Sequence, residues 1–201
     1  MRSKEISDIF GDFFYSACLT LAAEPLRNLI TFGGNIVQVY QWSHFPVLLC
    51  VLNGRAILHS GEKIEFKDFF SKHPKTFLKK DDIVVGAEID KPENSRRFFF
   101  KRTSFTAFDY SIASLAMNIK FNTVGNISDL KISTGALRPL PYIIHDFKGF
   151  QDYYMDKALN MDSIQNICLF VEKNIKPNKD FRVSNEYKVK CLAGLIKNCF
   201  I

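Results

Sequence analysis

The alternation of apolar with small or polar residues over positions 113–121 constrains the fold of this chain most strongly. A period of two is typical of a β-strand with one buried face. The apolar positions of this stretch are Ala113, Leu115, Met117, Ile119 and Phe121. Gly125-Asn126 then predicts a turn, and residues 127–137 are expected to return as the next strand. The sequence therefore predicts a half-buried strand in an antiparallel hairpin in the second half of the chain.

Helical spacing of apolar residues follows this hairpin. We expect two helices between Lys148 and Asn174, and a last one from about Asn185 to Asn198 that Ser184 caps. Strands followed by grouped helices are typical of the α+β class. The chain contains no G-x-G-x-x-G between a strand and a helix, which argues against a Rossmann nucleotide site.

The first half of the chain predicts shorter elements. Apolar residues have helical spacing over residues 7–26, so we expect one helix there, closed by Pro25. Residues 27–36 are expected to form a loop, and residues 46–52 a buried helix or strand, between which periodicity does not decide. Strands are expected at residues 56–60, 64–66 and 82–89. The polar residues 90–97 then predict a boundary between two lobes.

Charge and cysteine usage argue against several classes of function. The 201 residues include 27 basic and 21 acidic ones, a net charge of +6 that is spread along the chain, whereas nucleic-acid binding favours a clustered basic surface. The five cysteines are odd in number and form no C-x-x-C pair, and the four histidines are scattered. We therefore expect no metal site and no disulfide framework, but reduced thiols in a cytoplasmic protein.

An apolar run over residues 13–23 has some features of a signal peptide. Acidic residues (Glu5, Asp8 and Asp12) precede it where basic residues are usual, so a buried helix fits better. The apolar run at residues 46–52 is too short to span a bilayer. We therefore expect no membrane segment.

Residues 31–35 read T-F-G-G-N, and residues of these types are typical of a ligand-binding loop. Two glycines let the backbone adopt positive φ and approach a ligand closely, and successive N–H groups can form an anion-binding nest. Thr31 and Asn35 add hydrogen-bonding side chains at both ends. The alternative is a Gly-Gly-Asn turn that only reverses the chain, and these residues alone do not decide between the two.

Four blocks of sequence around and after this loop occur in the order of a known family. Residues 27–49 contain R-N-x-x-T-x-G-G-N-I and S-x-x-P-x-L-L, and residues 69–84 contain F-F, K-T-x-L and D-D-I-V. Residues 100–102 read F-K-R, and residues 180–188 read D-F-R-V-S-x-x-Y-K. Together they resemble the signature of the FAD-binding flavoprotein subunits of molybdenum hydroxylases, the family that includes xanthine dehydrogenase and carbon monoxide dehydrogenase.

The resemblance implies a fold and a function. Residues 1–93 would be the second lobe of a PCMH-type FAD-binding domain, and residues 94–201 an α+β domain like the C-terminal domain of the carbon monoxide dehydrogenase flavoprotein. The chain would be an oxidoreductase subunit that passes electrons from iron–sulfur centres through FAD to NAD or another acceptor. Its partners would be a molybdopterin-binding subunit and a 2Fe-2S subunit, and no catalytic acid or base is needed on this chain.

The resemblance also implies binding residues. Thr31, Gly33, Gly34 and Asn35 would lie along the FAD, with Thr31 contributing its hydroxyl. Three further residues outside this loop would contact the cofactor: His44, Val84 and Lys101. Val84 would lie near the adenine or flavin edge. Lys101 would reach the flavin, where a cation favours the anionic reduced form; a solvated strand lysine is the alternative.

Two departures from the family pattern leave a second function open. The family's Ser-Asp is here Ser43-His44, so an imidazole stands in place of a carboxylate. The first family lobe, with its own glycine loop for the FAD pyrophosphate, has no counterpart upstream of Gly33. We therefore expect an FAD half-site that a missing lobe or another chain completes. The alternative function is a non-enzymatic remnant or interaction module that packs against partner subunits without binding FAD on its own.

Overall fold

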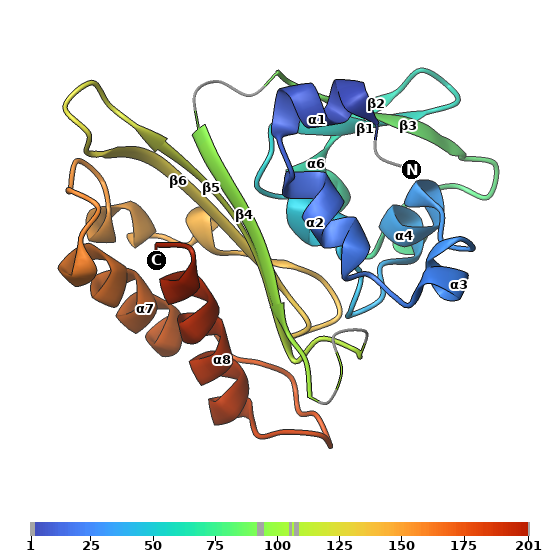
Figure 1. The fold of residues 1–201 in the computed structure, drawn as a ribbon. Coiled ribbons are helices and arrows are strands. Elements are labelled where there is room, and N and C mark those ends of the chain that lie inside the picture. The colour runs from blue at the N-terminus through green and yellow to red at the C-terminus, as the bar shows by residue number, and fades with distance from the viewer. Residues whose placement is uncertain (1–2, 92–94, 105, 107–108, 201) are drawn as a thin grey trace.

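A computed structural model describes residues 3–91, 95–104, 106 and 109–200 of the chain. Its first part combines short helices with a small sheet, and its second part combines a larger sheet with two long helices (Figure 1). The elements of the first part are α1 (Lys4–Phe10), α2 (Phe13–Leu19), α3 (Glu24–Arg27), α4 (Phe32–Gln38), α5 (Phe45–Leu49), β1 (Gly54–Leu58), β2 (Lys63–Glu65), α6 (Phe66–Phe69), the 3-10 turn Pro74–Thr76 and β3 (Val84–Ile89). The elements of the second part are β4 (Ser95–Arg102), β5 (Ala113–Phe121), β6 (Ile127–Gly135), β7 (Tyr142–Ile143), the 3-10 turns Ile144–Asp146 and Phe150–Tyr153, α7 (Met161–Asn174) and α8 (Asn185–Asn198).

Both sheets are antiparallel. The first has the strand order β2-β1-β3, and the second has the order β4-β5-β6-β7. Figure 1 shows α7 and α8 on one side of the second sheet and the helices of the first part on its other side. The α+β fold class predicted from the sequence is confirmed, as is the hairpin of β5 and β6.

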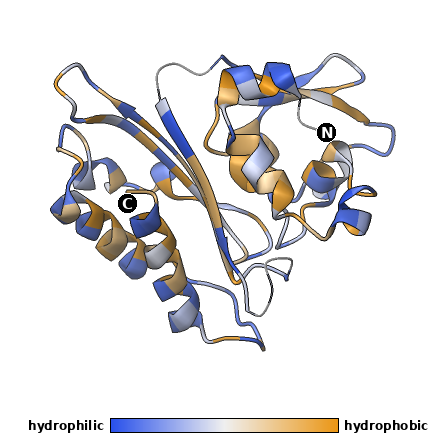
Figure 2. Cartoon of the chain, in the orientation of Figure 1, coloured by the Kyte–Doolittle hydropathy of each residue, from blue (hydrophilic) through white to orange (hydrophobic). Residues whose placement is uncertain are grey.

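The central strand β5 is buried on both faces, so the prediction of a half-buried strand was wrong. Leu115 and Met117 pack into one cluster with Leu192 of α8. Ala116, on the opposite face, packs with residues of the first part such as Val47 of α5. The alternating positions Ser114, Ala116 and Asn118 are small or carry an amide, and they meet another layer of protein instead of water. Figure 2 shows that the neighbouring strand β4 is hydrophobic in its middle and hydrophilic at both ends.

The long helix expected over residues 7–26 is divided into α1, α2 and α3. Gly11 ends α1 with a φ of 61°, a value that favours glycine, and its N–H donates to the Ser7 carbonyl oxygen. Phe10 and Phe13 nevertheless pack into the same cluster, and this shared core explains why the apolar spacing continues across the break.

Other local predictions had mixed outcomes. Residues 46–52 begin as the buried helix α5, with Pro46 in its first turn. Of the two helices expected between Lys148 and Asn174, only α7 is a regular α-helix in the described residues, and the other is the 3-10 turn Phe150–Tyr153. The helix α8 has the predicted bounds, and the Ser184 side chain accepts a hydrogen bond from the Tyr187 N–H, so the predicted cap is confirmed.

The expected lobe boundary lies between β3 and β4. The strand β3 ends at Ile89 and β4 begins at Ser95, while Pro92, on which this prediction partly depended, lies outside the described residues. Across the described ranges, none of the helices is long and apolar enough to cross a membrane.

Candidate functional site

A surface cavity of about 660 Å³ lies where the first part of the chain meets the loop before β5. Apolar residues between α2 and α4, among them Leu26 and Leu29, line one side of it. The first turn of α4 contributes Thr31, Gly34 and Asn35. Three residues predicted from the sequence to bind a ligand are thus together at one cavity.

The backbone of residues 32–35 is helical, which corrects the expectation of a loop with positive φ at the glycines. Thr31 is the N-cap of α4, and its Oγ1 accepts a hydrogen bond of 3.0 Å from the Gly34 N–H. Neither Gly33 nor Gly34 is among the described glycines with positive φ. The threonine cap satisfies an N–H group of the first turn and so allows the helix to begin at Phe32.

The two glycines differ in what surrounds them. A Cβ atom at Gly34 would lie 2.9 Å from Thr31 Oγ1, so any other residue there would push the capping hydroxyl out of its present position. A Cβ atom at Gly33 would meet nothing within 4 Å. Glycine costs a helix about 1 kcal/mol relative to alanine, and no contact within the described chain accounts for that cost at Gly33. The open space at Gly33 therefore fits the close approach of a ligand.

Asn35 ties this turn to the next helix. Its Oδ1 accepts a hydrogen bond of 3.2 Å from the N–H of Phe45, the first residue of α5. The side-chain amide also has two N–H donors, and the residue lines the cavity. Asn35 can therefore hold the turn in place and still present donors to a ligand.

Three half-exposed aromatic side chains form a wall of the cavity, and sequence reasoning missed all of them. The rings of Tyr40 and Trp42 stack with centroids 5.3 Å apart and planes within 7°. The centroid of the Tyr110 ring lies 4.2 Å from that of the Trp42 ring. Exposed aromatic faces suit a planar ring ligand. The one signal in the sequence was the chain's single tryptophan, within Y-Q-W directly after α4.

The ammonium group of Lys101 is bound to backbone carbonyl oxygens, one of them in the residue before Tyr110. Its Nζ donates to the Thr20 carbonyl oxygen over 2.5 Å and to the Asp109 carbonyl oxygen over 3.3 Å. Burial lowers the pKa of this ammonium group, while Asp109 opposes the shift. Asp109 lines the cavity. Lys101 is therefore connected to the cavity through its hydrogen bond to the Asp109 carbonyl oxygen.

His44 and Val84 lie in packed surroundings. The His44 side chain is 3% exposed and its Nδ1 lies 3.1 Å from the Ala17 carbonyl oxygen. Burial lowers the pKa of His44 to about 4. Val84 packs at the edge of a cluster that contains Ile36 and Phe69. The structure therefore gathers Thr31, Gly34 and Asn35 at the cavity and places His44 and Val84 against the protein interior.

A second cavity, of about 730 Å³, adjoins the first. Asp109 and Tyr110 line both cavities, and the second also has Arg102, Arg182 and Ser184 in its lining. Within the described ranges, no three His, Cys, Asp or Glu side chains are placed to hold a metal ion together.

Two family matches span nearly the whole chain. Residues 3–92 match the family described as the FAD binding domain in molybdopterin dehydrogenase. Residues 98–201 match the CO dehydrogenase flavoprotein C-terminal domain.

Individual relatives agree with these matches. The glyceraldehyde dehydrogenase medium chain of Sulfolobus acidocaldarius is 28% identical over 190 residues, which cover 92% of this chain and 66% of that protein. The xanthine dehydrogenase FAD-binding subunit of Escherichia coli O157:H7 is 22% identical over 187 residues, covering 90% of this chain and 63% of that protein. The chain thus spans slightly less than two thirds of the length of these relatives.

Solved structures share the fold. Carbon monoxide dehydrogenase from Hydrogenophaga pseudoflava aligns with a TM-score of 0.84 at 18% identity, over 96% of this chain and 67% of that chain. Quinoline 2-oxidoreductase from Pseudomonas putida 86 aligns with a TM-score of 0.86 at 16% identity, over 99% and 68%. The resemblance drawn from the four sequence blocks is confirmed. The chain belongs to the family of FAD-binding flavoprotein subunits of the molybdopterin dehydrogenases.

Proposed function

We propose that this chain is an FAD-binding electron-transfer subunit of a molybdenum-dependent hydroxylase or dehydrogenase. The observation that carries the proposal is a cavity with an aromatic wall, lined by Thr31, Gly34 and Asn35 next to the open backbone position Gly33, in a chain of this family. FAD, when bound, supplies the electron transfer between iron–sulfur centres and NAD or another acceptor.

The residues of the cavity fit the two ends of such a cofactor. The Thr31 hydroxyl already accepts from the Gly34 N–H, so its own O–H remains to donate to a ligand oxygen. The Asn35 amide offers N–H donors beside it. Trp42 and Tyr110 offer ring faces to a planar ring system. Lys101 adds positive charge near the wall, which stabilises negative charge on a bound group.

The relatives' names support the wider assignment. They are called a medium chain and an FAD-binding subunit, as expected of one component of a larger complex. We infer partners that carry the molybdopterin and the 2Fe-2S centres, a division of labour between residues 1–93 and 94–201, and a cytoplasmic location. We further infer that this cavity is an FAD half-site, completed by a lobe or chain outside the residues described.

A second function is favoured by the apolar surface beside the cavity. Leu26 and Leu29 are 60% and 78% exposed, and large exposed apolar groups that lie together are typical of interaction surfaces. The chain would then be an interaction module that packs against partner subunits without binding FAD on its own.

The flavin spectrum of the purified chain decides between the two. We would purify the full chain alone and after co-expression with the products of its neighbouring genes, and measure flavin absorbance and fluorescence titrations with FAD. Binding that is weak alone and tight with a partner supports the half-site. Tight stoichiometric binding by the chain alone would contradict the half-site, and no binding in either preparation would leave the interaction module.

A further inference from the structure

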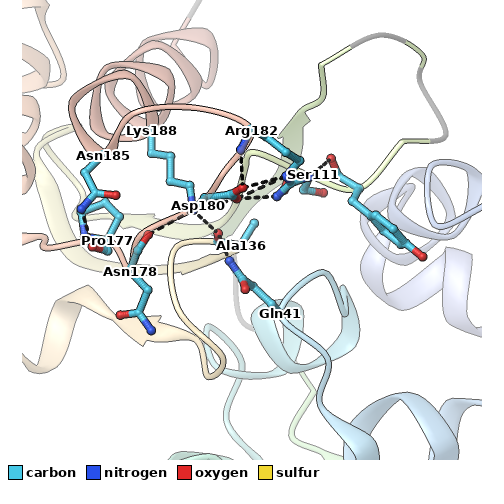
Figure 3. Close-up of polar contacts among 10 residues, drawn as sticks. Gln41, Ser111, Ala136, Pro177, Asn178, Asp180, Arg182, Asn185 and Lys188 are labelled. Carbon is cyan, nitrogen blue, oxygen red and sulfur yellow. Dashed lines mark hydrogen bonds and ion pairs between the residues drawn. The ribbon is translucent and has the colours of Figure 1, made fainter.

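Helix α8 carries a lysine whose ammonium group is buried. The Lys188 side chain is 0% exposed, and burying an unpaired charge is costly. Its Nζ lies 3.1 Å from Asp180 Oδ2 and 3.4 Å from each of the Ala136 and Asn178 carbonyl oxygens. These three acceptors match the three donors of an ammonium group. Lys188 thus joins α8 to the loop before it and to the end of β6 (Figure 3).

Asp180 connects this lysine to an arginine. Arg182 Nε and Nη2 donate to the Asp180 carboxylate over 3.0 and 2.7 Å, and the Arg182 backbone N–H donates to it as well, over 2.9 Å. The hydrogen bonds from Arg182 hold the pKa of the Asp180 carboxyl far below its usual range. The carboxylate therefore fixes the guanidinium in one orientation, since fork-like pairing with a carboxylate is geometrically specific.

One end of this cluster holds the segment that bears Tyr110. Arg182 Nη1 donates to the Tyr110 carbonyl oxygen over 3.2 Å, and Nη2 donates to the Ser111 carbonyl oxygen over 3.4 Å. Figure 3 shows Arg182 directed at Ser111 from the loop before α8. The Tyr110 ring is the one that packs on Trp42.

The other end holds the segment that bears Trp42. The Ala136 carbonyl oxygen accepts from Lys188 Nζ and also from Gln41 Nε2, the latter over 2.7 Å. The Ala136 N–H donates in return to the Gln41 carbonyl oxygen over 2.9 Å. Ala136 has a φ of 66°, unusual for a residue other than glycine, so two contacts with Gln41 and one with Lys188 fix it. Gln41 directly precedes Trp42 in the chain.

We propose that Asp180, Arg182 and Lys188 form a positioning cluster that sets the spacing of Trp42 and Tyr110 and so shapes the cavity for a planar ring. The cluster acts through the backbone on either side of the two rings. That the ring is the flavin of FAD rests on the proposed function. The control of the aromatic wall by α8 and the loop before it does not depend on the proposed function.

The chain's single tryptophan makes this testable without a cofactor, because all tryptophan fluorescence comes from Trp42. We would measure its emission maximum and its quenching by acrylamide in the full chain and in Arg182→Gln, Arg182→Lys and Lys188→Met. Lys190→Met is the matched control, since Lys190 lies on the same helix and forms an ion pair with the exposed Glu186. Arg182→Lys keeps the charge without the fork and serves if a more drastic variant does not fold.

We expect a red shift of Trp42 emission and faster quenching in the Arg182 and Lys188 variants, measured below their unfolding transitions, and no change in the control. FAD affinity, measured in the preparation that binds it, should fall about tenfold, because displaced aromatic rings pack less closely against a bound planar ring. Unchanged Trp42 emission and quenching in folded variants would overturn the proposal, even if their melting temperatures fall. Absence of FAD binding by every protein would count against the proposed function alone, because the tryptophan measurement still decides the role of the cluster.

Discussion

The imidazole of His44 donates a hydrogen bond from Nδ1 to the carbonyl oxygen of Ala17, 3.1 Å away. A carbonyl oxygen can only accept, so the proton of the neutral ring lies on Nδ1. The ring also lies 4.9 Å from the Phe99 ring of β4. His44 thus joins the start of α5 to α2 and to the second sheet, as a neutral residue in a buried position.

This contact predicts how stability depends on pH. Burial first, and the Lys101 charge less strongly, lower the pKa of His44 from 6.5 to about 4 in the folded state. The unfolded chain therefore binds more protons between these values, and the free energy of unfolding should fall as the pH drops from about 6.5 to 4, by on the order of 3 kcal/mol for this group. Urea denaturation across this range measures the slope.

A matched pair of substitutions isolates the His44 contribution. His44→Gln removes the titrating group and should flatten the slope between pH 6.5 and 4. His59→Gln, at an exposed histidine, should leave it as in the wild type. Equal slopes in all three proteins would show that His44 titrates as it does in the unfolded chain.

The cap of α8 should contribute measurably to stability. Ser184→Ala removes the acceptor of the Tyr187 N–H and should lower the free energy of unfolding by about 1 kcal/mol. Ser184→Asp retains an acceptor and adds favourable charge at the helix N-terminus, so it should remain close to the wild type. Chemical denaturation compares the three. A loss as large in Ser184→Asp as in Ser184→Ala would count against the cap.

The two glycines of α4 should respond oppositely to alanine. Gly33→Ala adds a Cβ where nothing lies within 4 Å, and the folded chain should gain up to about 1 kcal/mol from helix propensity. Gly34→Ala pushes against Thr31 Oγ1 and should destabilise the chain through the cap. Thermal unfolding without ligand measures both. If FAD approaches this backbone, Gly33→Ala should in addition weaken FAD binding despite its stability.

The burial of both faces of β5 is open to a direct test. Ala116→Leu adds volume between this strand and the first part of the chain, where Ala116 is 0% exposed, and should cost about 1–3 kcal/mol by overpacking. Val85→Leu is the control at an exposed strand position of β3. A neutral Ala116→Leu would mean that this face of β5 is open to solvent.

Local patterns predicted the parts of the fold that depend on local spacing. The strands β5 and β6 and the helix α8 follow directly from periodicity and a capping serine. The helix α4 was missed because two adjacent glycines are more typical of a loop, whereas the Thr31 cap makes a helix there. The second buried face of β5 was missed because its partners, such as Val47, lie far away in the sequence.

The site was predictable only where one short segment supplies it. Thr31, Gly34 and Asn35 lie within one helical turn, and the family motif pointed to them. The aromatic wall combines Trp42 with Tyr110, from segments that share no periodicity and meet only in the folded chain. Burial of Lys188 was likewise invisible, because a lysine on a helix is usually solvated, and its partner Asp180 precedes the helix.

The position of β5 between the two layers has a consequence for how the chain is made. Residues 3–91 are synthesised before β4 and β5, so the surface formed by α2 and α5 acquires its cover only when these two strands have followed. Until then, the first part of the chain exposes an apolar face, and such a state is prone to aggregation. The core shared by the two parts can form only after the residues near 121 have been translated. Slow synthesis of the hairpin, or removal of the second part, should therefore leave the apolar face of the first part exposed and bound by chaperones.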